Sequence, residues 1–120
     1  MLYTVVEMPT FLSDCQRAGL SEDEHFAIVL AIAEDPFAGD LIKGTGGARK
    51  RRFKGRGKGK SGGYRTISYY AADDVPVVLL ALIDKGERAD MTQAERNALR
   101  SRLMNYAPTY RAGRGKGGQG

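Results

Sequence analysis

Apolar residues in the first twenty positions predict a short strand followed by a helix. β-Branched and aromatic residues over 3–7 predict the strand, which ends before Pro9. The helix is predicted from about Thr10, because Phe11, Cys15 and Ala18 recur at helical spacing. Gly19 stands where a glycine commonly ends a helix.

A second helix is predicted directly after the first. Ser21 and Glu24 have the spacing of a capping box, and Asp35-Pro36 stops the helix. Apolar residues between these signals fall at i, i+3, i+4 and i+7 and predict the buried stripe: Phe26, Val29, Leu30 and Ala33. The two segments together form a helical hairpin.

Three further strands are predicted over 48–53, 64–70 and 77–83. In the second, alternation places Arg65, Ile67 and Tyr69 on one face and the remaining residues, Tyr64, Thr66, Ser68 and Tyr70, on the other. The third is apolar on both faces, which is typical of a strand covered on both sides. Short connections, including a turn at Asp73-Asp74, predict an antiparallel meander.

A last helix opens at Thr92 and Glu95, a second capping box, and carries an inner stripe of Leu99, Leu103 and Tyr106. Ala107-Pro108 is predicted to close it. Residues 108–120 are rich in glycine, arginine and lysine, which predicts a disordered tail after a domain at 1–107. The order of elements indicates an α+β fold, a small sheet with helices on one side.

Charge is distributed unevenly along the 120 residues, whose formal net charge is +5. Residues 1–42 contain eight acids and one base, whereas residues 43–72 contain ten bases and no acid. Residues 73–120 add eight bases and six acids. A purely basic middle segment predicts a face of strongly positive potential, and a polyanion is its natural partner.

Several classes of protein are not expected from this sequence. No apolar run is long enough to span a membrane, and the first residues lack the features of a secretory signal, so we expect a cytoplasmic protein. A lone Cys15 forms no internal disulfide and no cysteine-type zinc site, so we expect no metal and no cofactor. His25 has no second histidine nearby and is interpreted as a helix-surface residue.

Two glycine-rich matches in the basic segment do not indicate a nucleotide-binding fold. Residues 57–62 match the G-x-G-x-x-G pattern, but a strand follows them where dinucleotide binding needs a helix N-terminus. Gly59-Lys60-Ser61 resembles the end of a phosphate-binding loop, yet Lys54 stands where that loop requires glycine. We expect the stretch from Lys54 to Gly63 to be a mobile loop.

The basic residues instead favour binding to RNA. Lysine and arginine contact phosphates, and neighbouring aromatic rings can stack on unpaired bases. Seven residues are predicted to bind RNA in this way: Lys50, Arg52, Lys54, Arg56, Lys58, Tyr64 and Tyr69. Cations also suffice for cleavage, because arginines can stabilise the charge that develops when a 2′-OH attacks the adjacent phosphate, and a lysine of lowered pKa can transfer the proton.

Four blocks of sequence resemble the RelE/ParE superfamily of bacterial toxins, and more closely its HigB-like mRNA interferases. The blocks are residues 4–11, 39–50, 59–65 and 90–95. The resemblance implies a compact α/β fold with the helical hairpin first, and a twisted, mainly antiparallel sheet that takes mRNA in the ribosomal A site. It also implies a helix-turn-helix antitoxin as partner.

The resemblance further implies catalytic roles for four residues, Arg49, Lys60, Arg65 and Lys85, with Arg65 stabilising the transition state. Arg51 stands where relatives have an apolar residue. Two alternatives stay open: a gyrase-poisoning toxin of the same fold, and an RNA-binding protein without catalysis.

Overall fold

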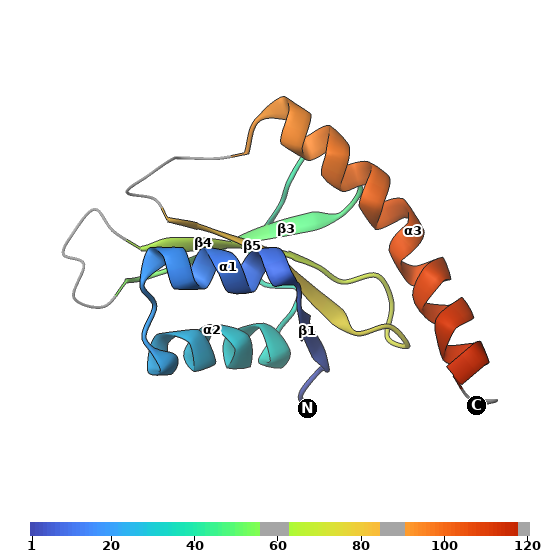
Figure 1. The fold of residues 1–120 in the computed structure, drawn as a ribbon, viewed down its shortest axis with the longest axis horizontal. Helices are drawn as coiled ribbons and strands as arrows, with labels where there is room; N and C mark the ends of the chain where they lie inside the picture. Colours follow the sequence, from blue (N-terminus) through green and yellow to red (C-terminus); the bar gives the residue numbers. More distant parts are fainter. Residues whose placement is uncertain (56–62, 85–90, 118–120) are drawn as a thin grey trace.

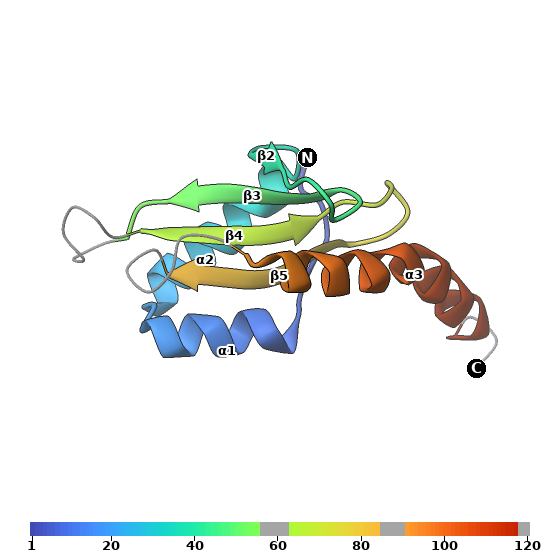
Figure 2. The same cartoon turned by 90° about the horizontal axis from the view of Figure 1, so that it is seen from above.

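A computed structural model gives the fold of residues 1–55, 63–84 and 91–117 (Figure 1). The elements in chain order are β1 (Val5–Glu7), α1 (Pro9–Ala18), α2 (Glu22–Glu34), β2 (Asp40–Leu41), β3 (Ala48–Phe53), β4 (Tyr64–Tyr69), β5 (Val77–Asp84) and α3 (Gln93–Gly117). The sheet order is β1-β5-β4-β3-β2, in which β1 pairs parallel with β5 and the other pairs are antiparallel. The α+β class and the antiparallel meander of β3, β4 and β5 are confirmed (Figure 2).

The sheet separates two helix layers, so the prediction that all helices lie on one side is wrong. Helices α1 and α2 cover one face, where Phe11, Ile32 and Leu79 belong to one buried cluster. Helix α3 covers part of the other face, where Leu99 and Leu103 pack with Val78 and other sheet residues (Figure 1). Because β5 is apolar on both faces, each face needs its own cover, and α3 supplies the second.

The local signals at the helical hairpin are confirmed, and the predicted inner stripe of α2 is confirmed in part, since Ala33 is buried and Val29 packs against the core. Ser21 and Glu24 form both hydrogen bonds of the capping box, and Gly19 ends α1 in the left-handed conformation with φ 74°. The residues of α2 that are buried are Ile28, Ile32 and Ala33, whereas Phe26 is 67% exposed. Apolar residues lie on several sides of α2, so helical spacing is compatible with more than one choice of buried face.

Strand β1 covers only part of the edge of β5, and helix α1 covers the rest of that edge. β1 pairs only with Val77, Val78 and Leu79. Beyond this point α1 packs along β5, and the Leu82 backbone N–H donates a 2.9 Å hydrogen bond to the Asp14 carboxylate. This contact satisfies an edge donor that would otherwise be open to another strand.

Helix α3 runs through Pro108, so the prediction that Ala107-Pro108 closes it is wrong. Proline removes one helical hydrogen bond, but tertiary contacts on both sides hold the helix. The Tyr106 hydroxyl donates to the Pro76 carbonyl at 2.9 Å, and the Arg111 guanidinium makes two 2.8 Å bonds to Asp74. Residues 108–117 are therefore helical, whereas the division of the chain into a domain and a tail stays a prediction. Among the described residues, no helix combines the length and apolar character that crossing a membrane requires.

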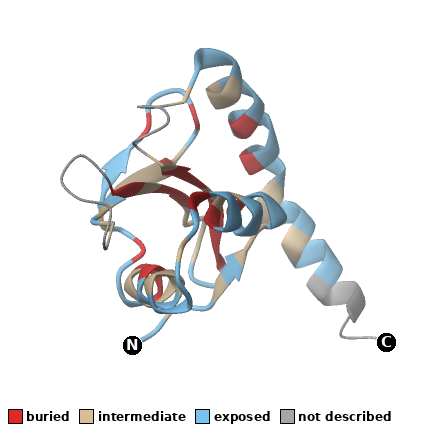
Figure 3. Ribbon diagram, turned by 60° about the vertical axis from the view of Figure 1, so that its left-hand side comes forward, coloured by how far each residue is buried: buried red, intermediate tan, exposed pale blue. Residues whose placement is uncertain are grey.

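The exposed surface and the buried core are distributed as this layering requires (Figure 3). Buried residues concentrate in β4 and β5 and on the sides of the helices that face them. The two-residue strand β2, which the sequence did not predict, is exposed at the edge of the sheet. At the end of β3, Arg52 and Lys54 are exposed as well.

Candidate nucleic-acid interface

The strand register divides the cations of β3 between the two faces of the sheet. Arg52 lies opposite Arg65 of β4, and Lys50 lies opposite Ile67. Residues paired across antiparallel strands share a face, and Ile67 packs in the cluster on the α3 side. The side chains of Lys50, Arg52 and Arg65 therefore emerge on the α3 side of the sheet.

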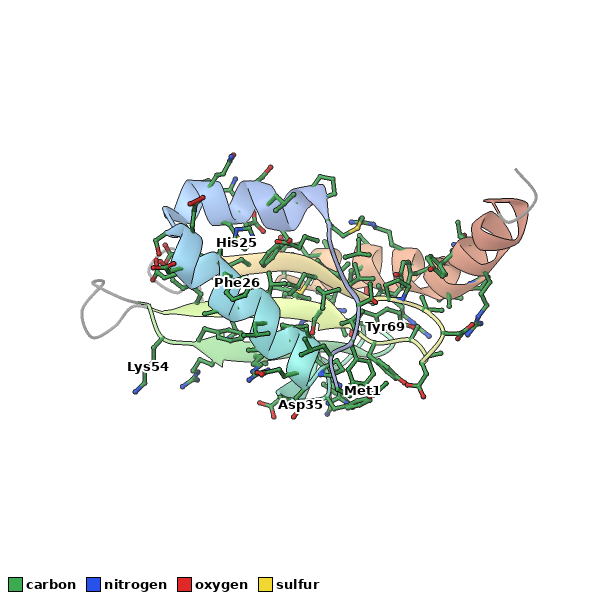
Figure 4. The ribbon with its side chains drawn as sticks, turned by 90° about the horizontal axis from the view of Figure 1, so that it is seen from below. Met1, His25, Phe26, Asp35, Lys54 and Tyr69 are labelled. Carbon is green, nitrogen blue, oxygen red and sulfur yellow. The ribbon has the colours of Figure 1, made fainter. Side chains whose placement is uncertain are left out.

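We call Lys50, Arg52, Lys54 and Arg65 the cationic face. Arg52 and Lys54 are exposed, whereas Lys50 and Arg65 are half-buried. Lys54 projects from the end of β3 away from the body of the molecule (Figure 4). Like charges directly opposite each other, as in the Arg52–Arg65 pair, destabilise a sheet. An anion bound between the two side chains would offset that repulsion.

The other two arginines of β3 face α2 and bind backbone carbonyls. Arg49 donates to the Phe37 carbonyl at 3.0 Å. Arg51 donates to the Ala31 carbonyl at 3.1 Å and, more weakly, to that of Asp35 at 3.4 Å. These carbonyls lie at the C-terminal end of α2 and in the turn after it, and the Ala31 carbonyl also accepts the Asp35 backbone N–H. The structure therefore separates Arg49 from Arg65, although the resemblance assigns both to catalysis.

Arg51 also explains how a charged residue fits where an apolar one was expected. Its guanidinium carbon lies 5.1 Å from the centre of the Phe53 ring, in a cation–π arrangement. The residue is half-buried, with its charge directed to the end of α2. Arg51 thus connects β3 to the helix layer.

The two tyrosines that the sequence assigned to RNA binding have different environments. Tyr64 is 1% exposed and belongs to the buried cluster under α1 and α2, so the prediction that it stacks on a base is wrong. Its position as the first residue of β4 places it on the hairpin face by alternation. Tyr69 lies on the α3 side, half-buried, with its ring 6.2 Å from that of Tyr106 at an angle of 69°.

Four predicted site residues, Arg56, Lys58, Lys60 and Lys85, lie outside the described residues. The residues that flank them are described, and they lie at one end of the sheet. Phe53 is opposite Tyr64 in the register, and Tyr64 is opposite Asp84, which directly precedes Lys85. The segments that contain Lys58, Lys60 and Lys85 therefore start next to the Arg52–Arg65 pair.

The sequence suggested that His25 is a helix-surface residue, but its side chain is half-buried and contacts other residues. Its Nε2 atom contacts the Glu7 carboxylate, and its ring lies 5.7 Å from that of Phe11, between α2 and α1 (Figure 4). This position is on the hairpin layer, away from the cationic face. In the described part of the chain, no three His, Cys, Asp or Glu side chains gather in a way that could hold a metal ion.

Cys15 is a core residue, in agreement with the sequence interpretation. It is 4% exposed, and burial raises the pKa of its thiol to about 11, with the charges of Glu7 and Asp14 adding to the effect. A thiol of that pKa is protonated at neutral pH and is a poor nucleophile.

Sequence reasoning missed Arg100, an exposed residue of α3. A Cβ atom built on Gly46 would lie 3.7 Å from Arg100 Cγ, so the arginine lies against the turn that leads into β3. Its position directly after the buried Leu99 could have indicated that Arg100 lies at the border between α3 and the sheet.

Comparison with protein families identifies the family of the chain. A family model described as the RelE toxin of the RelE / RelB toxin-antitoxin system matches residues 10–113. The match begins in α1, includes every strand after β1, and extends into the part of α3 beyond Pro108. The chain therefore belongs to the RelE toxin family, as a toxin of a toxin–antitoxin system whose partner is an antitoxin.

Proposed function

We propose that the protein is a ribosome-dependent endoribonuclease of the HigB-like branch, which cleaves mRNA during translation in the cytoplasm. The observation that carries the proposal is the Arg52–Arg65 pair, two arginines that lie opposite each other in the strand register on the α3 side of the sheet. Guanidinium groups bind phosphate in a bidentate manner and stay charged at every physiological pH.

The proposed reaction uses the RNA's own 2′-OH as nucleophile. The 2′ oxygen forms a bond to the adjacent phosphorus, the bond from phosphorus to the 5′ oxygen breaks, and the products end in a 2′,3′-cyclic phosphate and a 5′-OH. Extra negative charge develops on the phosphoryl oxygens in the transition state. Arg65, with Arg52 beside it, is placed to stabilise that charge.

Proton transfer requires two further groups, one to take the 2′ proton and one to donate a proton to the leaving 5′ oxygen. We assign these roles to Lys60 and Lys85, whose segments start beside the arginine pair. Nearby cations lower the pKa of a lysine, which favours proton exchange near neutral pH. Arg49 is given no part in the reaction, because it lies on the other face and binds Phe37.

The ribosome would supply the selectivity that this face lacks. Cations bind backbone phosphates without reading bases, so an exposed row of them holds any single strand. A ribosome presents mRNA in a fixed frame and would orient one phosphate against the arginine pair. The proposed antitoxin, a helix-turn-helix protein, would prevent this encounter.

Cleavage of ribosome-bound mRNA by the purified protein tests the proposal. We expect cyclic-phosphate and 5′-OH ends on mRNA in programmed ribosomes, few ends on free mRNA, and loss of cleavage in Arg65→Ala. Arg17→Ala is the matched control, since Arg17 is an exposed arginine on the hairpin layer. Binding without cleavage would establish an RNA-binding protein instead, and stabilised gyrase–DNA complexes would establish a gyrase poison.

A further inference from the structure

The turn at residues 43–47 leads into β3 and contacts α3. It lies at the start of β3, whereas the Arg52–Arg65 pair lies near the end of that strand. Three glycines of this turn, Gly44, Gly46 and Gly47, have positive φ. Cβ atoms built on Gly46 and Gly47 would lie 3.7 Å from Arg100 Cγ and 3.2 Å from Tyr69 Cε1, respectively. Since α3 and Tyr69 lie on the same side of the sheet as the cationic face, so does this junction.

The turn is held in one conformation by a buried threonine. Thr45 is 0% exposed, and its hydroxyl donates to the Ile42 carbonyl at 2.7 Å. The same oxygen accepts the Ala48 backbone N–H at 3.0 Å. Lys43, which is exposed, and Arg100 are therefore carried on a fixed turn and a fixed helix rather than on free chain ends.

Cations thus occupy both ends of a row along β3. Lys43 belongs to the turn that leads into the strand, and Arg100 lies against Gly46 of the same turn. The Arg52–Arg65 pair lies near the other end of the strand. The register also places Asp40 opposite Lys50, which weakens the middle of the row and leaves its ends as the strongest positions for an anion. The extended backbone from residue 47, just before β3, to residue 52 spans roughly 16 Å. This length corresponds to about five stacked nucleotides of single-stranded RNA.

We propose that Lys43 and Arg100 form a second phosphate-binding patch, so that the backbone of the RNA runs along β3 between this patch and the Arg52–Arg65 pair. The inference rests on the proposed RNA-binding function and adds to it a path and a minimum length for the bound strand. RNA that reaches only one end of the row gains only one set of phosphate contacts.

Two oligonucleotides of different length test this inference. We would measure the affinity of the full chain for a 2′-O-methyl trinucleotide and a 2′-O-methyl nonanucleotide, which lack the attacking hydroxyl. Arg100→Ala should weaken binding of the nonanucleotide about tenfold, the effect of one charged hydrogen-bonding contact. It should lower the slope of log affinity against log salt by about one, measured from about 50 to 200 mM.

The trinucleotide should respond to Arg100→Ala by about twofold or less, because it binds at one end of the row. Arg100→Lys keeps the charge and should restore most of the nonanucleotide affinity. Arg17→Ala, on the opposite layer, should leave both affinities unchanged. Since Arg100 is exposed, equal thermal unfolding of wild type and variants checks that the fold is intact.

Nonanucleotide affinity that Arg100→Ala leaves unchanged while Arg52→Ala weakens it would overturn the second patch and leave the proposed function standing. Equal weakening of both oligonucleotides by Arg100→Ala would also overturn it, since the patch would not be separate. A wild-type chain that binds neither oligonucleotide would overturn the proposed RNA face itself.

Discussion

Replacing Arg51 with methionine should destabilise the protein without weakening its binding to RNA. Arg51 donates to the Ala31 carbonyl at 3.1 Å and to that of Asp35 at 3.4 Å, and it stacks on Phe53 at 5.1 Å. Methionine keeps the length of the side chain but removes the charge and the donors. Asp35 still donates its backbone N–H to the Ala31 carbonyl, so that acceptor keeps one partner.

The expected loss of unfolding free energy follows from these contacts. A charged hydrogen bond at a half-buried site contributes about 1.5 kcal/mol, and a partly exposed cation–π contact about 0.5–1 kcal/mol. We therefore expect Arg51→Met to lower the free energy of unfolding by about 2 kcal/mol. For a domain of this size, that change corresponds to a Tm lower by about 8 °C.

Arg52→Met is the matched control, because it is the same substitution one residue further along the strand. Arg52 is exposed and lies opposite Arg65, so its loss should change the unfolding free energy by no more than about 0.5 kcal/mol. Urea unfolding and oligonucleotide affinity are measured for both variants. Equal losses of stability, or loss of RNA binding in Arg51→Met alone, would refute the division of the cations between the two faces.

Three further outcomes are expected. Ser21→Ala should lower the unfolding free energy by about 1 kcal/mol in urea titrations, because the capping box of α2 loses its hydroxyl; an unchanged midpoint would contradict this role. At about pH 8 the thiol of Cys15 should resist a disulfide reagent until the chain unfolds, because burial raises its pKa to about 11; rapid reaction of the native protein would contradict it. The hydrogen bond to Asp73 raises the pKa of Tyr70 to about 12, so its stabilising effect is complete below the unfolded pKa and is lost as pH rises through the folded one. Ultraviolet titration should show this late ionisation shifted to lower pH in Asp73→Asn, and no shift would count against the assignment.

Local signals in the sequence predicted most of the elements because they act over a few residues. The bounds of β3 and both capping boxes are confirmed, and so is the alternation along β4 that separates Arg65 and Ile67 from Tyr64. A strand apolar on both faces indicated cover on both sides, yet the helices were predicted on one side, and that prediction is wrong.

Features that depend on tertiary contacts were not predictable in this way. The helix continues past Pro108 because Arg111 binds Asp74, a residue 37 positions away in the chain. The separation of Arg49 from Arg65 depends on the register between β3 and β4, and composition counts both simply as cations. Tyr64 was predicted to bind RNA from its neighbours in sequence, whereas its neighbours in space are core residues.

Mapping of new 5′ ends across the transcriptome, after induction of the chain without its antitoxin, tests the central claim most directly. The account predicts ends clustered within translated frames, absent when Arg65→Ala is induced to the same level and still present with Arg17→Ala. Growth arrest without new ends, or ends that persist in Arg65→Ala, would contradict a ribosome-dependent endoribonuclease that acts through this face.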